Sequence, residues 1–149
     1  MIGLQFFGVS NFEQFSQKSI LQSTIQLKNE TMSRLKKCPS SPNCVCTIDA
    51  EVSKKKMDAL SYTGSLTDAK NAMKATISAM KRTQLKAEEA DYLHFTFKTA
   101  LGGFIDDVEF EFDDTNKKIH FRSASRVGYS DMGANKRRMK KVGKAWDQR

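Results

Sequence analysis

Three segments in which every second residue is apolar constrain the fold of this chain most strongly. They are residues 93–97, 108–112 and 119–121, and Leu, Val, Ile and Phe fill their apolar positions. A period of two places alternate side chains on opposite faces of a β-strand, so each segment predicts a half-buried strand. Residues 113–116, Asp-Asp-Thr-Asn, are turn residues between the second and third segments, and they predict a β-hairpin.

One register of this hairpin gathers its apolar residues and also pairs its opposite charges. Directly opposed side chains interact most strongly in an antiparallel pair, so complementary neighbours favour that register. The expected pairs are Phe112 with Ile119, Glu111 with His120, and Glu109 with Arg122.

Two amphipathic helices are predicted, one before these strands and one after them. Residues 65–68 fit a capping box, and apolar residues follow at spacings of three and four as far as Met80. The last helix is expected to begin at Ser130 or Asp131, because either side chain can cap its exposed amides. The expected buried residues of the last helix are Met132, Met139, Val142 and Trp146.

These elements predict an α+β fold. We expect an antiparallel sheet of three or four strands with two helices packed on one face, a two-layer sandwich. Both prolines, Pro39 and Pro42, lie in a loop that marks the expected domain boundary. Residues 1–37 are interpreted as an N-terminal arm, helical or partly disordered, and residues 38–149 as a single folded domain.

The charge balance indicates the kind of partner that the chain favours. Lys and Arg number 25 against 17 Asp and Glu, a formal net charge of +8, which suits an acidic partner but also a basic protein without one. No run reaches the roughly 20 apolar residues of a membrane-spanning helix. The first ten residues lack the basic lead-in and cleavage site of a signal peptide, which predicts a cytoplasmic location.

The three cysteines predict no metal site. Cys38, Cys44 and Cys46 have a spacing that matches no common zinc motif, and neither histidine of the chain lies near them in sequence. The proline-containing loop can bring Cys38 and Cys44 within disulfide range, whereas a reducing cytosol favours three thiols. The sequence leaves these two alternatives open.

The expected junction between the last strand and the last helix, residues 121–135, concentrates directional polar side chains. Asp106 and Asp107 point to opposite faces if their segment is a strand, and one of them can pair with an arginine of the junction. Guanidinium groups near a helix start favour an anion, whereas capping by Asp131 would occupy that position and leave a buried hydrogen-bond network. The candidate polar site consists of Asp106, Asp107, Arg122, Ser123, Ser125, Arg126, Tyr129, Ser130, Asp131 and Asn135.

Three segments resemble the motifs of one family. Residues 38–45 read C-P-S-S-P-N-C-V, residues 104–110 read F-I-D-D-V-E-F, and residues 122–135 read R-S-A-S-R-V-G-Y-S-D-M-G-A-N. In this order they resemble the domain-of-unknown-function 1499 family, from about residue 37 to the C-terminus. The resemblance implies a shared fold and places the candidate site residues and Cys38 and Cys44 in motifs, but it implies no reaction.

The resemblance also bears on location. Many members of that family look exported to the periplasm or a plastid lumen, which suits a disulfide between Cys38 and Cys44 and opposes the cytoplasmic prediction. This chain departs from the family pattern at Cys46 and Thr47, where the family usually shows two serines.

The leading functional hypothesis is a non-catalytic binding or accessory domain. Its pocket is expected between the polar junction and the Asp106-Asp107 strand, and its ligand is expected to be small and anionic or polar. An enzyme using Asp106 or Asp107 as general acid or base is one alternative. Polyanion binding through the basic C-terminal helix is another, but Trp146 is its only aromatic residue, which disfavours nucleic acid. No cofactor is indicated.

Overall fold

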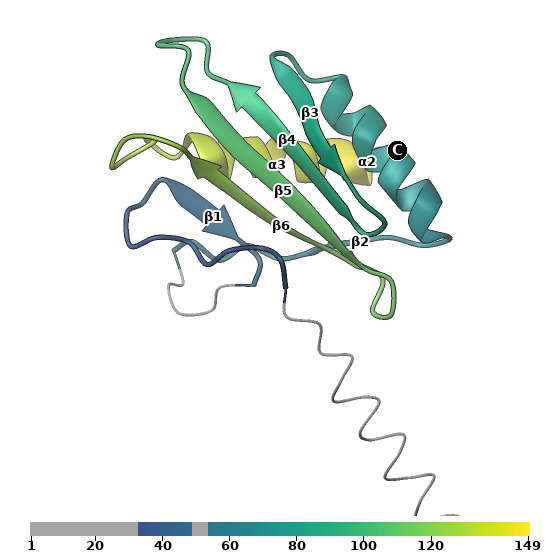
Figure 1. Cartoon of the computed structure of the whole chain (residues 1–149). Helices are drawn as coiled ribbons and strands as arrows, with labels where there is room; N and C mark the ends of the chain where they lie inside the picture. The colour runs from purple at the N-terminus through teal and green to yellow at the C-terminus, as the bar shows by residue number, and fades with distance from the viewer. Residues whose placement is uncertain (1–32, 49–53) are drawn as a thin grey trace, which may run out of the picture. The chain divides into compact units, whose positions relative to one another are not determined.

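The structure is a computed structural model that describes residues 33–48 and 54–149. Residues 34–149 cluster as one unit, and Figure 1 shows them as a twisted sheet with two helices. The predicted N-terminal arm lies outside the described residues for most of its length, as far as residue 32.

The sheet has six strands, and every pairing between them is antiparallel. Five strands lie in the order β1-β6-β5-β4-β3, and β2 pairs with the remaining length of β6. The strands are β1 (Cys44–Cys46), β2 (Leu60–Ser61), β3 (Thr83–Glu88), β4 (Tyr92–Lys98), β5 (Ile105–Asp113) and β6 (Lys118–Ser125).

The expected count of three or four strands was therefore too low, and the missed strands explain why. The strands β1 and β2 have only three and two residues, too few to display a period of two. None of the six residues of β3 is buried, so its sequence carries no apolar alternation. Neither kind of strand gives the signal on which the prediction depended.

The β5–β6 hairpin confirms the predicted register. Phe112 lies opposite Ile119 in this hairpin. The residues of both predicted charged pairs also lie opposite each other, because a shift of one residue would have turned the apolar side chains of one strand away from the core. These pairs are Glu111 with His120 and Glu109 with Arg122.

The first helix was predicted correctly, whereas the last begins later than expected. The helix α2 (Leu66–Ser78) starts after Ser65, whose hydroxyl accepts a hydrogen bond from the Asp68 amide at 3.1 Å. The helix α3 (Ala134–Asp147) begins after Gly133, which has a φ of 77°. Met132, expected in the buried stripe, has a φ of 51° and is 88% exposed. The turn that precedes α3 directs this side chain away from the core.

The core lies between one face of the sheet and both helices. Along β5 buried residues alternate strictly with half-buried ones, so only one face of the strand enters the core. In Figure 1 the helices α2 and α3 lie on the same side of the sheet. One apolar cluster joins Met73 of α2, Trp146 of α3 and Phe110 of β5. No helix of the described residues has the length and apolarity needed to cross a membrane.

Candidate functional site

The polar junction and the twin-aspartate segment lie side by side. Asp106 pairs with Ser125 across the β5–β6 ladder, and Asp107 pairs with Ala124. Because adjacent strand residues point to opposite faces, the structure divides the candidate residues between the inner face, against α3, and the outer face.

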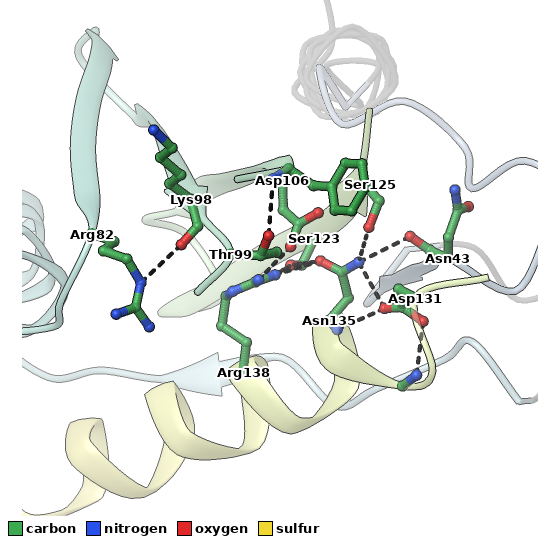
Figure 2. Close-up of polar contacts among 12 residues, drawn as sticks. Asn43, Arg82, Lys98, Thr99, Asp106, Ser123, Ser125, Asp131, Asn135 and Arg138 are labelled. Atoms are coloured by element: carbon green, nitrogen blue, oxygen red, sulfur yellow. Dashed lines mark hydrogen bonds and ion pairs between the residues drawn. The ribbon is translucent and has the colours of Figure 1, made fainter. Parts of the chain in front are cut away.

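Asn135, in the first turn of α3, is the centre of the inner group and is completely buried. Its side-chain oxygen accepts a hydrogen bond from Ser123 Oγ at 2.6 Å. Its amide nitrogen lies 3.0 Å from the Asn43 carbonyl, 3.0 Å from Ser125 Oγ and 2.8 Å from Asp131 Oδ2. Figure 2 shows these contacts converging from β6, the loop before β1 and the start of α3. The network therefore joins three segments that are distant in sequence.

Arg138 completes the inner group, although its importance was not predicted. Its guanidinium forms an ion pair with Asp106 and donates to Asn135 Oδ1 at 2.6 Å and to Ser123 Oγ at 3.2 Å. The guanidinium also lies over the Phe97 ring, 4.8 Å from its centroid. The available signal was spacing, since Arg138 follows Asn135 by three positions and therefore lies on the same face of the helix.

The start of α3 is capped by Asp131 from outside the helix. Asp131 Oδ1 accepts a hydrogen bond from the Gly133 amide at 2.8 Å, and Oδ2 accepts one from the Asn135 amide at 2.7 Å. Ser130 Oγ accepts a hydrogen bond from the Met132 amide at 3.2 Å. The chain's own carboxylate thus occupies the position where an external anion would bind a helix start.

On the outer face, Asp107 forms hydrogen bonds with Arg126 and His94. The guanidinium of Arg126 binds both carboxylate oxygens at 2.9 Å, and His94 Nε2 lies 2.7 Å from Oδ1. Burial alone would raise the pKa of Asp107, but the hydrogen bonds and charges of Arg126 and His94 outweigh it and lower this pKa. The same contact raises the pKa of Arg126. Asp107 therefore carries no proton to donate at neutral pH.

A second polar group lies beside it on the outer face. Arg122 donates to Glu109 Oε2 at 2.9 Å, and Tyr92 donates to Glu109 Oε1 at 2.7 Å. Burial, followed by the hydrogen bond to Glu109, raises the pKa of Tyr92, so the phenol stays protonated. Arg122 Nε is buried and makes no hydrogen bond among the described residues. Arg122 and Arg126 thus lie across the sheet from Asn135, and these three residues do not line one pocket.

These positions can be compared with known proteins. A family model described as "Protein of unknown function (DUF1499)" matches residues 34–145. The chain belongs to the DUF1499 family. The match confirms the resemblance drawn from the three motifs, and it extends over nearly all of the unit formed by residues 34–149. No curated protein matched the chain.

The first DUF1499 motif forms a crosslinked loop. Cys38 and Cys44 are joined by a disulfide across a sequence separation of six, and Cys46, which lies outside this bond, is buried. Asn43 of the same motif donates from its amide nitrogen to the Gly128 carbonyl at 2.5 Å. The first motif is thereby attached to the third.

A hollow of about 300 Å³ lies between these two motifs of the DUF1499 domain. Lys55 lines it, is only 7% exposed, and donates a hydrogen bond from Nζ to the Pro39 carbonyl. Asp131 also lines it, but both of its oxygens already accept amide hydrogens. Its lining residues are Ser40, Pro42, Cys44, Val45, Lys54, Lys55, Tyr129, Asp131, Gly133 and Lys136.

A second hollow of the DUF1499 domain, of about 460 Å³, lies along α3 and away from the three motifs. Its charged lining is balanced, with Asp58 and Asp147 beside Lys140 and Lys144. Among residues 33–48 and 54–149, no group of three or more His, Cys, Asp or Glu side chains is arranged to hold a metal ion.

Proposed function

We propose that this DUF1499 domain is a non-catalytic binding domain that takes a small anionic ligand in the hollow between its first and third motifs. The ligand class is the one predicted from the sequence, but the site lies to one side of the polar junction. The inner part of the junction is filled by its own side chains, since Ser123, Asn135 and Asp106 are buried and bonded to one another or to Arg138.

The observation that carries the proposal is the environment of Lys55. Lys55 as a residue is buried, and its ammonium group donates to a neutral carbonyl, that of Pro39. Within the described residues, no carboxylate forms an ion pair with Lys55. Buried charges are normally paired because their desolvation is expensive, so a bound anion would supply the missing partner.

The remaining lining supports the same ligand class. Lys54 and Lys136 bring two more ammonium groups to the hollow, and Ser40 and Tyr129 bring hydroxyl groups. The single lining carboxylate, Asp131, is already satisfied by backbone amides and adds little repulsion. The larger hollow along α3 lacks this excess of positive charge and is the weaker candidate.

The enzyme alternative has less support. A general acid or base needs an accessible carboxylate with a pKa near the working pH. Asp106 is buried against Arg138, and the pKa of Asp107 is lowered by Arg126 and His94. Polyanion binding along α3 has no further observation in its favour.

The test is isothermal titration of the full chain with inorganic phosphate, pyrophosphate and citrate. We expect at least one of them to bind, and Lys55→Met, which keeps the length of the side chain, to weaken binding by about tenfold or more. Lys136→Gln should also weaken binding. Because Lys136 is exposed, this variant should fold even if Lys55→Met does not.

The matched control is Lys86→Met on β3, at the opposite edge of the sheet from β1. It removes the same charge from an exposed position far from the hollow and should leave the affinity unchanged. The absence of binding by all three anions, or equal losses in Lys55→Met and Lys86→Met, would overturn the proposal.

A further inference from the structure

Large apolar side chains are exposed together at one end of the sheet. Among the described residues, five of the seven exposed large apolar side chains lie in two loops, 99–104 between β4 and β5 and 126–133 between β6 and α3. They are 54 to 88% exposed, and we call them the apolar rim. The apolar rim consists of Leu101, Phe104, Val127, Tyr129 and Met132.

The two loops leave the sheet beside each other. The Arg126 amide donates to the Ile105 carbonyl at 3.1 Å, so Phe104 and Val127 each lie one residue beyond this contact. Figure 1 shows both loops extending from the same end of the sheet. The apolar rim is therefore formed by neighbouring segments and is not scattered over the surface.

The backbone of each loop holds the apolar side chains in place. Gly102 has a φ of 77°, and an added Cβ there would lie 2.5 Å from the Phe104 ring. Met132 has a φ of 51°, a conformation that is unfavourable for a residue with a side chain. A soluble surface gains nothing from presenting an apolar side chain in this way, so we interpret the exposure of Met132 as functional.

Three positively charged side chains lie beside the two loops of the apolar rim. Lys98 packs against the first loop, with its Cε 3.2 Å from the Cβ position of Gly103, and Arg82 donates to the Lys98 carbonyl at 3.1 Å. Beside the second loop, Arg137 of α3 donates to the Met132 carbonyl at 2.6 Å. The carboxylate of that loop, Asp131, is occupied by backbone amides. The surface thus combines protruding apolar side chains with neighbouring positive charges.

We propose that the apolar rim docks on the surface of an anionic lipid bilayer, with its apolar tips inserted among the acyl chains near the headgroups. Apolar and aromatic side chains favour that boundary, while neighbouring Lys and Arg side chains bind anionic headgroups. A protein interface would more commonly present a continuous apolar core that is depleted of charged residues. Here the apolar tips project from two separate loops, with Lys98 beside the first loop and Arg137 beside the second. The inference does not depend on ligand binding in the hollow.

The test is co-sedimentation of the full chain with phosphatidylcholine vesicles, with and without phosphatidylglycerol, at about 0.15 M salt. We expect binding that requires phosphatidylglycerol and weakens as salt increases. Leu101→Ser/Met132→Ser should reduce binding by about tenfold or more, because two apolar side chains no longer insert. Both residues are exposed, so the fold should tolerate the change.

Ile48→Ser/Leu85→Ser is the matched control, since these residues are 41 and 39% exposed and lie outside the apolar rim. It should bind vesicles as the unmodified chain does. Lys98→Gln/Arg137→Gln should weaken binding to the anionic vesicles, because it removes two charges that attract the headgroups. Failure of the full chain to bind anionic vesicles would overturn the inference, and so would equal binding by the rim variant and the control.

Discussion

Asp106 and Asp107 are adjacent in the chain, yet they form ion pairs with arginines on opposite faces of the sheet. Asp106 faces inward and pairs with Arg138 of α3, whereas Asp107 faces outward and pairs with Arg126. The twin-aspartate motif therefore has two separate roles. One aspartate attaches the sheet to the last helix, and the other attaches β5 to the loop that follows β6.

We predict that Arg138→Met lowers the free energy of unfolding by about 3 kcal/mol, because it leaves the buried Asp106 carboxylate without its cation. The Arg138 side chain is 13% exposed and that of Asp106 is 2% exposed, so water cannot readily replace the lost partner. Urea unfolding followed by the fluorescence of buried Trp146 would measure the change.

The double variant Asp106→Leu/Arg138→Met gives the decisive comparison. Removing both charges should destabilise the domain by less than the sum of the two single variants, because neither charge is then left alone. Arg138 also bonds Asn135 and Ser123, so part of the loss should persist in the double variant. Strict additivity would contradict a buried ion pair.

Asn135 should be the most sensitive neutral polar residue of the domain. Asn135→Ala is expected to cost about 3 kcal/mol, because the buried hydroxyl of Ser123 loses the acceptor of its proton and the Asn43 carbonyl loses one of its two hydrogen bonds. Asn116→Ala, in the exposed β5–β6 turn, is the control and should cost less than about 1 kcal/mol. Equal losses in chemical denaturation would show that the network around Asn135 contributes little.

The sequence predicted those elements in which burial follows a regular period. Phe112 and Ile119 alternate with charged residues, and only one register buries the first set while pairing the second. Helix α2 was predicted for the same reason, since its capping residue and its buried apolar stripe both indicate a helix that begins in the same place. Where the period of the apolar side chains matches their burial in the fold, the sequence alone predicted the element and its register.

The candidate site was less predictable because contacts distant in sequence decide it. Arg138 lies in a basic run, which indicates a solvated helix face, but its ion pair with Asp106 removes most of its side chain from solvent. Arg122 and Arg126 were expected beside Asn135, but strand alternation places them on the outer face with Glu109 and Asp107. No periodicity in the sequence indicates the hollow beside Lys55.

The disulfide of the first motif should stabilise the domain modestly. It closes a short loop, with Cys38 and Cys44 separated by six positions, and a loop of this size corresponds to about 2 kcal/mol in the chain-entropy description. Cys38→Ser/Cys44→Ser should lower the free energy of unfolding by this amount, measured in urea. Reductant should lower the free energy of unfolding of the unmodified chain to that of the variant. If reductant also destabilised the variant, its remaining cysteine, Cys46, would have to form a reducible bond.

Acid should remove the stabilisation that comes from Asp107. Because the folded state lowers the pKa of this carboxyl group, its contribution is fully present above its ordinary unfolded value of about 3.9. The contribution is lost as the pH falls through the lowered value, where the folded protein takes up the proton. Asp107→Asn should therefore be less stable than the unmodified chain at pH 7, and the difference should diminish below about pH 4.

Urea unfolding at a series of pH values would measure this difference. Other carboxyl groups with lowered pKa values, such as Asp113, are present in both proteins, so their contributions cancel. Arg126→Gln offers an independent check, because it removes the cation that binds both oxygens of Asp107. The loss of stability in Arg126→Gln should diminish over the same pH range as the loss in Asp107→Asn. A deficit that stays constant from neutral to acid pH in both variants would show that the ion pair contributes no stability.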